Sequence, residues 1–324
     1  MIRLGVVGTS SICEKFIAAA RQTGRFAFSA VLSRNEQRGR TFADRHGFIE
    51  SFTDMEAMAK TIDAVYIASP NICHASQSRF FLEKGVHVLC EKPIAVSLHE
   101  YRETKAIADQ NDCIYQEAII PRFAGERDAL LHALAAIGPL QTADIRYHQR
   151  SSRLDAFLEG QTPNIFNMSL HAGALMDLGV YCVYGAVDLL GIPQQIHASA
   201  DFVRGCDMGG TADFDYGSFV AHLSWRKDED VDSVSRFVGQ KGSLSVNMIS
   251  LYDGIVLEQD GQTTTLSLPD DRITRMAREA SAFADLIERN RNDSQVLSTL
   301  TSAVHKCMDE IKKQAHITYQ EEYA

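Results

Sequence analysis

The sequence predicts an α/β protein in which a doubly wound parallel sheet is followed by an α+β domain with a mainly antiparallel open sheet. Two observations lead to this fold class. Short apolar strands alternate with helical segments through residues 1–120, which requires the right-handed crossovers of a parallel sheet. Beyond Pro121 the alternation ends, and strand-like runs separated by turn signals follow. We therefore expect one domain at 1–120 and a second at 121–324.

Composition excludes several classes of protein. A net charge of −10 argues against binding to nucleic acid or to an anionic membrane. No apolar run approaches the roughly 20 residues of a membrane helix, and the N-terminus enters a strand without a signal-peptide layout. The seven cysteines are scattered and form no C-x-x-C pair, so we expect reduced thiols, a cytoplasmic location and no metal site.

The chain opens with a strand at 3–7, then Gly8, then a helix at 12–23. A strand, a glycine turn and a helix form the setting of a dinucleotide fingerprint, in which the helix N-terminus offers backbone N–H groups to a pyrophosphate. Ser10 and Cys13 stand where the second and third glycines would be, so a plain turn is the alternative. The candidate cofactor-binding residues here are Gly8, Thr9, Ser10, Ser11 and Ile12.

The end of the second strand, 26–32, predicts which cofactor binds. In the fingerprint a carboxylate about 20 residues after the glycines holds the ribose 2′-hydroxyl of NAD. This sequence has Ser33 and Arg34 at that place and no acid before Glu36. Because an arginine and a hydroxyl bind a 2′-phosphate, we expect NADP(H) rather than NAD(H). The alternative is that Arg34 is a solvated residue at the start of a helix.

The alternation then continues to residue 116. The expected helices are 35–46, 53–60, 73–84 and 97–111, and the expected strands are 64–67, 86–89 and 113–116. Parallel strands end at one edge of the sheet, where ligands bind. The polar residues that follow these three strands are Ser69, Pro70, Asn71, Glu91, Lys92 and Glu117, and we expect them to line the cofactor site.

The segment after the strand at 86–89 is the most unusual of these ends. A short apolar strand stops at Glu91 and Lys92 and is closed by Pro93. Proline turns the chain sharply because it fixes its own φ and donates no ladder hydrogen bond. Lys92 would therefore stand at the mouth of a cleft. The alternative is a surface salt bridge at a strand end.

The second half is expected to form a helix-backed sheet. The expected helices are 122–137, 172–190, 274–289 and 295–314; the expected strands are 140–149, 195–203, 217–225, 232–238, 242–249, 254–259 and 263–268. A hairpin turn is expected at 239–242, and 151–167 reads as a loop. A broad sheet face without helices favours a homodimer interface.

The helix at 172–190 carries an informative pair. Asp177 and Tyr181 are four residues apart and share one helix face. They are candidates for a proton donor and its orienting partner. The alternative is a tyrosine whose hydroxyl makes a structural hydrogen bond and has no role in catalysis. The candidate substrate-binding residues are Arg153, Asn167 and His171. A metal site built from His148, Asp177 and His171 has no recognised ligand spacing.

Together these motifs resemble the Gfo/Idh/MocA family of glucose–fructose oxidoreductase and inositol dehydrogenase. The resemblance covers nearly the whole chain and rests on Gly8–Ile12, Val65–Asn71 with His74, Glu91–Pro93 and Asp177–Tyr181. It implies a Rossmann domain, a substrate domain and a nicotinamide cofactor between them. It also implies that His74 joins the cofactor-binding residues, and that Lys92, Asp177 and Tyr181 are catalytic or substrate-binding. The Lys92–Pro93 bond is often cis in relatives.

The sequence departs from the family pattern at several positions. Many members have histidine where Tyr181 stands, and tyrosine resembles the branch that contains dimeric dihydrodiol dehydrogenase. Ser10 replaces a usual glycine, His171-Ala172 replaces a usual glycine pair, and Pro121 stands where an aromatic residue is common. These changes bear on cofactor affinity and on the shape of the substrate pocket.

The resemblance implies hydride transfer between a nicotinamide and a carbon of a sugar, polyol or vicinal diol. Tyr181 is the expected acid–base group, although an unperturbed tyrosine has a pKa near ~10. The Lys92 ammonium would favour the tyrosinate and stabilise alkoxide charge, and Asp177 would orient the substrate or Lys92. Lys92 as the proton donor is the converse assignment. Two other classes stay open: a non-catalytic nicotinamide-sensing regulator and an NAD-dependent glycosidase.

Overall fold

The computed structural model describes residues 1–267, 270–289 and 295–319. The chain divides into two compact units: Met1–Phe123 with Asp270–Ser302, and Ala124–Pro269 with Ala303–Ala324. The first division lies close to the expected boundary at residue 120. The segment that begins at Asp270 differs from the expectation, because it groups with the first unit although it follows the second along the chain.

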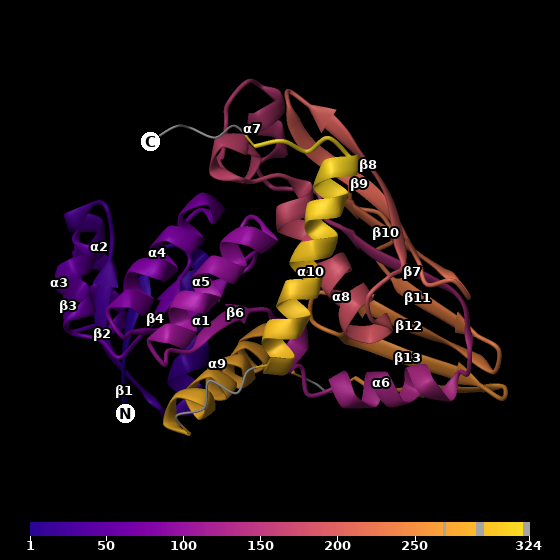
Figure 1. Ribbon diagram of the computed structural model, residues 1–324, viewed down its shortest axis with the longest axis horizontal. Helices are drawn as coiled ribbons and strands as arrows, with labels where there is room; N and C mark the ends of the chain where they lie inside the picture. Colours follow the sequence, from indigo (N-terminus) through magenta and orange to yellow (C-terminus); the bar gives the residue numbers. More distant parts are fainter. Residues whose placement is uncertain (268–269, 290–294, 320–324) are drawn as a thin grey trace. The chain divides into compact units, whose positions relative to one another are not determined.

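The first unit contains a six-stranded parallel sheet in the order β3-β2-β1-β4-β5-β6 (Figure 1). Its strands are β1 Ile2–Val7, β2 Phe26–Leu32, β3 Glu50–Phe52, β4 Ala64–Ile67, β5 His87–Glu91 and β6 Tyr115–Ala118. The chain reverses direction across the sheet between β1 and β4, which is the switch point at which such sheets bind ligands. The expected doubly wound sheet is confirmed. Only β3 was not expected, because three residues on a sheet edge show no periodicity.

The helices of the first unit follow the expected alternation. They are α1 Ser11–Thr23, α2 Glu36–His46, α3 Met55–Ala59, α4 Asn71–Glu83, α5 Leu98–Gln110, the 3₁₀ turn η1 Ile120–Phe123, α9 Arg272–Glu288 and the beginning of α10 Gln295–Gln314. Expected and observed ends differ by a few residues, partly because cap residues have extended backbone. Asn35, for example, caps α2 by accepting a hydrogen bond from Arg38 N at 2.8 Å.

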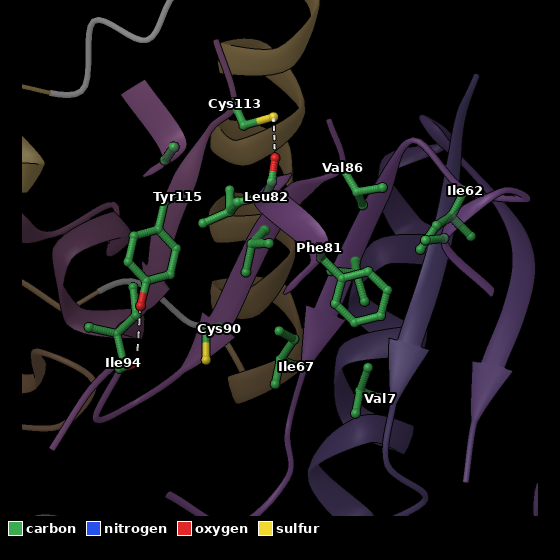
Figure 2. Packing of buried hydrophobic residues seen from close by; sticks show 14 of the residues in the cluster. Val7, Ile62, Ile67, Phe81, Leu82, Val86, Cys90, Ile94, Cys113 and Tyr115 are labelled. Carbon is green, nitrogen blue, oxygen red and sulfur yellow. Dashed lines mark hydrogen bonds between the residues drawn. The ribbon is translucent and has the colours of Figure 1, made fainter. Parts of the chain in front are cut away.

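The core of the first unit explains why its strands are apolar throughout. All four residues of β4 are buried, because helices cover both faces of a parallel sheet. On one face, Ile67 and Cys90 pack with Phe81 and the neighbouring apolar residues (Figure 2). On the other, the ring of Phe16 from α1 stacks on Tyr66 at 3.8 Å. The sheet is therefore a rigid base for the strand ends.

The second unit contains an eight-stranded sheet in the order β14-β13-β12-β11-β7-β10-β9-β8. Its strands are β7 Leu140–His148, β8 Gln195–Val203, β9 Cys206–Asp215, β10 Val220–Arg226, β11 Ser235–Gly239, β12 Gly242–Met248, β13 Asp253–Gln259 and β14 Gln262–Thr265. The pairing of β7 with β10 is parallel and the other pairings are antiparallel. The expected mainly antiparallel sheet and the β11–β12 hairpin are confirmed; Leu268, the end of the last expected strand, lies outside the described residues.

Strand β9 was not expected from the sequence. It contains Gly209 and Gly210, which have low strand propensity. The structure explains the second glycine, because a Cβ at Gly210 would lie 2.7 Å from the ring of Trp225, its cross-strand partner in β10. A local signal cannot reveal this requirement, which comes from a neighbouring strand.

The helical parts of the second unit also differ from expectation. They are α6 Arg127–Ala136, α7 Leu154–Leu158, the 3₁₀ turns η2 Asn164–Phe166 and η3 Met168–Leu170, the π-helical turn η4 Leu175–Gly179, α8 Val180–Leu190 and the end of α10. The expected loop at 151–167 thus contains helical turns, and the expected helix at 172–190 begins as a π turn. Met168–Leu190 is long and apolar enough to cross a membrane, but 83% of its tested window is buried, as in a core helix.

The two faces of the eight-stranded sheet differ in polarity. In β10, Leu223 and Trp225 are fully buried, and Trp225 packs against Gly179 at the start of α8. The alternate residues point to the opposite face, where His222 pairs with Asp213 at 2.7 Å. Dimerisation through this face stays a prediction.

A group of carboxylates lies inside the first unit. Glu117 and Glu279 are at most 4% exposed, and burial raises the pKa of Glu91. Neither carboxylate oxygen of Glu279 has a hydrogen-bond partner among the described residues. Burial, followed by the charges of Glu91 and Glu117, holds the pKa of Glu279 well above its usual value. Glu279 therefore binds a proton more tightly in the folded protein than in the unfolded chain.

We expect Glu279→Gln to stabilise the protein more at pH 8 than at pH 5. A carboxyl whose pKa is raised by folding contributes its full stability below the unfolded pKa and loses it as pH rises toward the folded pKa. The neutral amide avoids that loss, which we expect to be about 1 kcal/mol or more at pH 8. Thermal unfolding at both pH values measures the effect. Glu83→Gln, at an exposed position of the same unit, is the control, and equal shifts at both pH values would contradict the prediction.

Candidate functional site

The glycine turn after β1 has the geometry that a phosphate loop needs. Gly8 has φ of +111°, and a Cβ there would lie 3.0 Å from the carbonyl oxygen of Ala68, so glycine is required. Ser10 has φ of −88° and is the N-cap of α1, so its side chain causes no backbone strain. Thr9 is half-buried, and Ser11 and Ile12 open the helix. The turn thus presents the free N–H groups of α1, which bind phosphate.

Two arginines follow β2 in the first unit. Ser33 is half-buried, and its Oγ donates to Asn35 O at 3.0 Å, whereas Arg34 is exposed. Arg38, in the first turn of α2, donates from Nη2 to Thr9 O at 3.4 Å, so its guanidinium reaches the glycine turn. Arg38 was missed in the sequence; the signal was a second arginine four residues after the first.

The ends of β4 and β5 are connected by one buried histidine. His74 is 1% exposed; its Nε2 lies 2.8 Å from Ser69 O and its Nδ1 lies 2.8 Å from Pro93 O. Burial lowers the pKa of His74, and the two backbone carbonyls oppose this shift. His74 therefore fixes the segments around it. Pro70 caps α4, and Asn71 is the first residue of that helix.

The turn that carries Lys92 is held by several hydrogen bonds. The Lys92–Pro93 peptide bond is cis. Tyr66 donates its hydroxyl to Glu91 Oε1, and Lys92 N donates to Glu91 Oε2 at 3.3 Å. After the turn, Ile94 N donates to Glu117 Oε1 at 2.9 Å. Lys92 itself is half-buried.

Tyr115 supports the same turn from the next strand. Its hydroxyl donates to Ile94 O at 3.2 Å, the contact drawn at the lower left of Figure 2. The first unit thus brings the expected cofactor residues from the ends of β1, β2, β4, β5 and β6 to one edge of a single sheet.

In the second unit, Asp177 lies in η4 and Tyr181 in the first turn of α8. The Asp177 side chain is 40% exposed, and its Oδ2 lies 3.1 Å from Lys227 Nζ. Tyr181 is buried, and its ring meets Tyr147 of β7 edge-on at 5.7 Å. Asp177 is therefore one member of an ion pair that the sequence did not suggest.

Lys227 is the most informative residue that sequence reasoning missed. It directly follows β10 and its side chain is only 1% exposed. Its Nζ donates to Ile165 O at 2.8 Å and lies 4.8 Å from the ring centre of Phe166. A signal was available in the sequence. Lys227 follows Leu223 and Trp225 at a spacing of two residues, and side chains two apart in a strand point to the same face. Lys227 therefore shares the face of two large apolar residues.

A second acid near Lys227, Asp207, is fully buried. Asp207 Oδ2 accepts a hydrogen bond from Leu175 N at 2.7 Å, at the beginning of η4. Burial raises the pKa of Asp207 to about 6, while the Leu175 N–H and the Lys227 ammonium act against this shift. Gly173 leaves room for the carboxylate, because a Cβ there would lie 1.7 Å from Asp207 Oδ1. Asp207 therefore fixes the turn that carries Asp177.

The three expected substrate residues occupy different settings. Arg153 is exposed at the N-terminus of α7. Asn167 caps η3, with its Oδ1 accepting from Ser169 N at 3.1 Å and from Ser169 Oγ at 2.9 Å. His171 has φ of +54°, and its ring stacks on Tyr319 at 4.7 Å. Tyr319 was not expected, because residues so near the end of a chain carry no periodic signal.

Two further polar residues of the second unit have contacts that define their roles. Asp188 of α8 accepts two bonds from Arg127 at 2.6 and 2.8 Å and one from Tyr252 at 3.0 Å, so it has a structural role. His148 lies on the sheet face opposite Trp225, where its Nε2 contacts Ser224 Oγ at 2.8 Å. The suggested metal ligands His148, Asp177 and His171 are therefore not brought together.

Comparisons with known proteins agree with this architecture. Residues 2–119 match the GFO_IDH_MocA model, described as "Oxidoreductase family, NAD-binding Rossmann fold". The chain is 35% identical to the uncharacterized oxidoreductase YgjR of Escherichia coli, over 98% of each chain. It is also 35% identical to the scyllo-inositol 2-dehydrogenase (NADP(+)) IolU of Bacillus subtilis, over the full length of both. The chain belongs to the Gfo/Idh/MocA family.

As a Gfo/Idh/MocA protein, the chain is an oxidoreductase with an N-terminal Rossmann unit, and the expected family is confirmed. Solved structures agree on the fold. KijD10, a 3-ketoreductase from Actinomadura kijaniata in complex with NADP and TDP-benzene, superimposes with a TM-score of 0.87 over 97% of each chain. At 21% identity this likeness establishes the fold alone.

We expect Gly173→Ala to destabilise the protein more than Gly160→Ala. Both glycines have positive φ, +116° and +104°, but a Cβ at Gly160 meets nothing within 4 Å. Gly160→Ala therefore reports backbone strain alone, about 1–3 kcal/mol, and Gly173→Ala adds the collision with Asp207, for a further ~1–3 kcal/mol. Urea unfolding of both variants measures the difference. Equal losses would show that the space beside Asp207 is not what requires glycine.

Proposed function

We propose that this protein is an NADP-dependent dehydrogenase or reductase that acts on a CH–OH group of a sugar, polyol or vicinal diol. The observation that carries the proposal is the presence of Lys92, Asp177 and Tyr181 in a Gfo/Idh/MocA chain that matches its relative IolU along that relative's whole length. Two relatives support the substrate class: the Bacillus subtilis enzyme named for scyllo-inositol and NADP(+), and a Haloferax volcanii protein named D-xylose 1-dehydrogenase (NADP(+)) 2, 29% identical over 88% of each chain.

The first unit has the chemistry that NADP(H) requires. The glycine turn at Gly8 and the N-terminus of α1 suit the pyrophosphate. Arg34 and Arg38 supply two cations for the 2′-phosphate, and Ser33 supplies a hydroxyl. The other proposed contacts are Thr9, Ser10, Ser11, Ile12, Ser69, Pro70, Asn71, Glu91, Lys92 and Glu117, with His74 holding the strand ends. When bound, the nicotinamide supplies the hydride donor or acceptor.

We expect Arg34→Ala to weaken NADPH binding about 10- to 100-fold and to leave NADH binding within twofold. The difference arises because hydrogen bonds to a charged group contribute about 1.5–3 kcal/mol, and only NADPH carries the 2′-phosphate. Fluorescence titration with each cofactor measures this. Arg40→Ala, an exposed arginine further along α2, is the control. An equal loss for both cofactors would refute the assignment of Arg34.

The candidate catalytic residues have complementary roles in the proposal. Tyr181 transfers the proton at the substrate oxygen. The Lys92 ammonium stabilises the negative charge that develops on that oxygen and favours the tyrosinate. Asp177 accepts a hydrogen bond from a substrate hydroxyl and so orients the carbon that reacts. Arg153, Asn167 and His171 are proposed as further substrate contacts.

We expect Tyr181→Phe to lower turnover at least ~100-fold, the usual scale of general acid–base catalysis. NADP+ reduction, followed by absorbance over a panel of inositols, aldoses and vicinal diols, measures this. Tyr184→Phe removes the hydroxyl of a buried tyrosine one turn further along α8, and we expect it to retain turnover within about threefold.

Three outcomes of that assay would change the proposal. If Tyr181→Phe keeps nearly full turnover while Lys92→Met abolishes it, Lys92 is the proton donor. If the wild type binds NADPH tightly but turns over nothing in the panel, the protein is a nicotinamide sensor rather than a dehydrogenase. Release of an aglycone with unchanged NADPH absorbance would identify a glycosidase.

A further inference from the structure

Lys227 is buried in the second unit, where its ammonium contacts two segments and its backbone N–H contacts a third. Its Nζ lies 3.1 Å from Asp177 Oδ2 in η4 and donates to Ile165 O at 2.8 Å in η2. The ring of Phe166 lies 4.8 Å below it, and the backbone N–H of Lys227 donates to Met208 O of β9 at 2.7 Å. Each of these contacts restricts where the ammonium can go.

The titratable groups around Lys227 come from every segment packed on it. Asp177 contributes the direct ion pair from η4. Asp207 and Cys206 of β9 are both close enough for the ammonium to act against the rise of their pKa values. Burial, followed by the charges of Asp207 and Cys206, raises the pKa of Tyr319 in the C-terminal segment well above its usual value. Lys227 is thus a cation that acts on Asp177, Asp207 and Cys206.

Burial makes the Lys227–Asp177 pair consequential. A lysine that is 1% exposed has lost its hydration, so it must be compensated by hydrogen bonds and by a carboxylate. Asp177, at 40% exposure, keeps part of its carboxylate at the protein surface. One carboxylate oxygen is thus tied to the interior while the side chain still faces solvent. In general, a nearby cation favours the charged form of a carboxylate.

We propose that Lys227 is a positioning residue, whose buried ammonium holds the Asp177 carboxylate in one orientation so that Asp177 can accept a hydrogen bond from a substrate hydroxyl. This inference rests on the proposed dehydrogenase function. Lys227 does not touch the substrate. It acts through Asp177. Its ammonium is held by Ile165 O of η2 and its main chain by Met208 O of β9, and these contacts fix the position of the ammonium that binds the carboxylate.

A double-mutant cycle tests whether Lys227 acts through Asp177. We expect Lys227→Met to lower kcat/KM about 10- to 100-fold, because small displacements of a substrate-orienting group cost this much. In an Asp177→Asn background, the same change at Lys227 is expected to alter kcat/KM less than twofold. Removing the ammonium is also expected to move the acidic limb of the kcat/KM profile toward higher pH, and this movement is absent in Asp177→Asn.

Controls separate positioning from loss of structure. Lys306→Met, at an exposed lysine of α10, is expected to leave kcat/KM within twofold. Lys227→Gln keeps a donor for Ile165 O without the charge, so it provides a second route if Lys227→Met folds poorly; circular dichroism and NADPH binding report on folding. The second variant matters because removing only one partner of a buried ion pair is strongly destabilising.

The outcomes distinguish this inference from the proposed function. An equal loss of kcat/KM in the wild-type and Asp177→Asn backgrounds, or no loss in either, would overturn the positioning role while the dehydrogenase stands. A wild type that turns over no substrate with either cofactor would reject the proposed function itself, and the inference with it.

Discussion

Buried polar side chains that bond to the backbone hold the candidate catalytic groups in place. In the first unit, His74 and Glu117 bond to the C=O and the N–H of the Pro93–Ile94 peptide group, directly after Lys92. In the second unit, Asp207 bonds to the beginning of the π turn that carries Asp177. A buried polar group must find partners to avoid a large desolvation cost, so each of these side chains allows its segment few positions. The functional segments are irregular but fixed.

The sequence was sufficient for the elements whose signal is local. The strand at Phe26–Leu32 and the last helix, Gln295–Gln314, have the predicted limits, because the pattern of apolar residues defines them. Strand β9 was missed because its Gly210 is required by the Trp225 ring on the neighbouring strand, which leaves no space for a Cβ. The return of α9 to the first unit was missed for the same reason: an amphipathic helix shows that it has a buried face but not which surface buries it.

The candidate site was predictable to a similar extent. Residues at strand ends could be predicted to lie together because parallel strands share an edge, and Asp177 and Tyr181 could be proposed because a polar pair on an apolar helix is conspicuous; their roles stay predictions. Arg38, Lys227 and Tyr319 were missed. Each owes its importance to a contact with a residue distant in the sequence, such as the 62 positions between Ile165 and Lys227. The family resemblance added roles to residues but could not supply these supporting contacts.

The first unit is built from two separate parts of the chain, and this affects when it can fold during synthesis. Helix α9 packs on α1, and Met276, Ala280 and Phe283 of α9 are buried. Arg25, which follows α1, reaches Asp285 and Glu288 of α9 at 2.5 Å. Proteins fold from the N-terminus as the ribosome synthesises them. Here α1 is synthesised long before α9, the helix that packs on it, because α9 follows all the strands of the eight-stranded sheet in the chain. During that interval the surface of α1 that α9 later covers stays open, so the first unit is completed only near the end of synthesis.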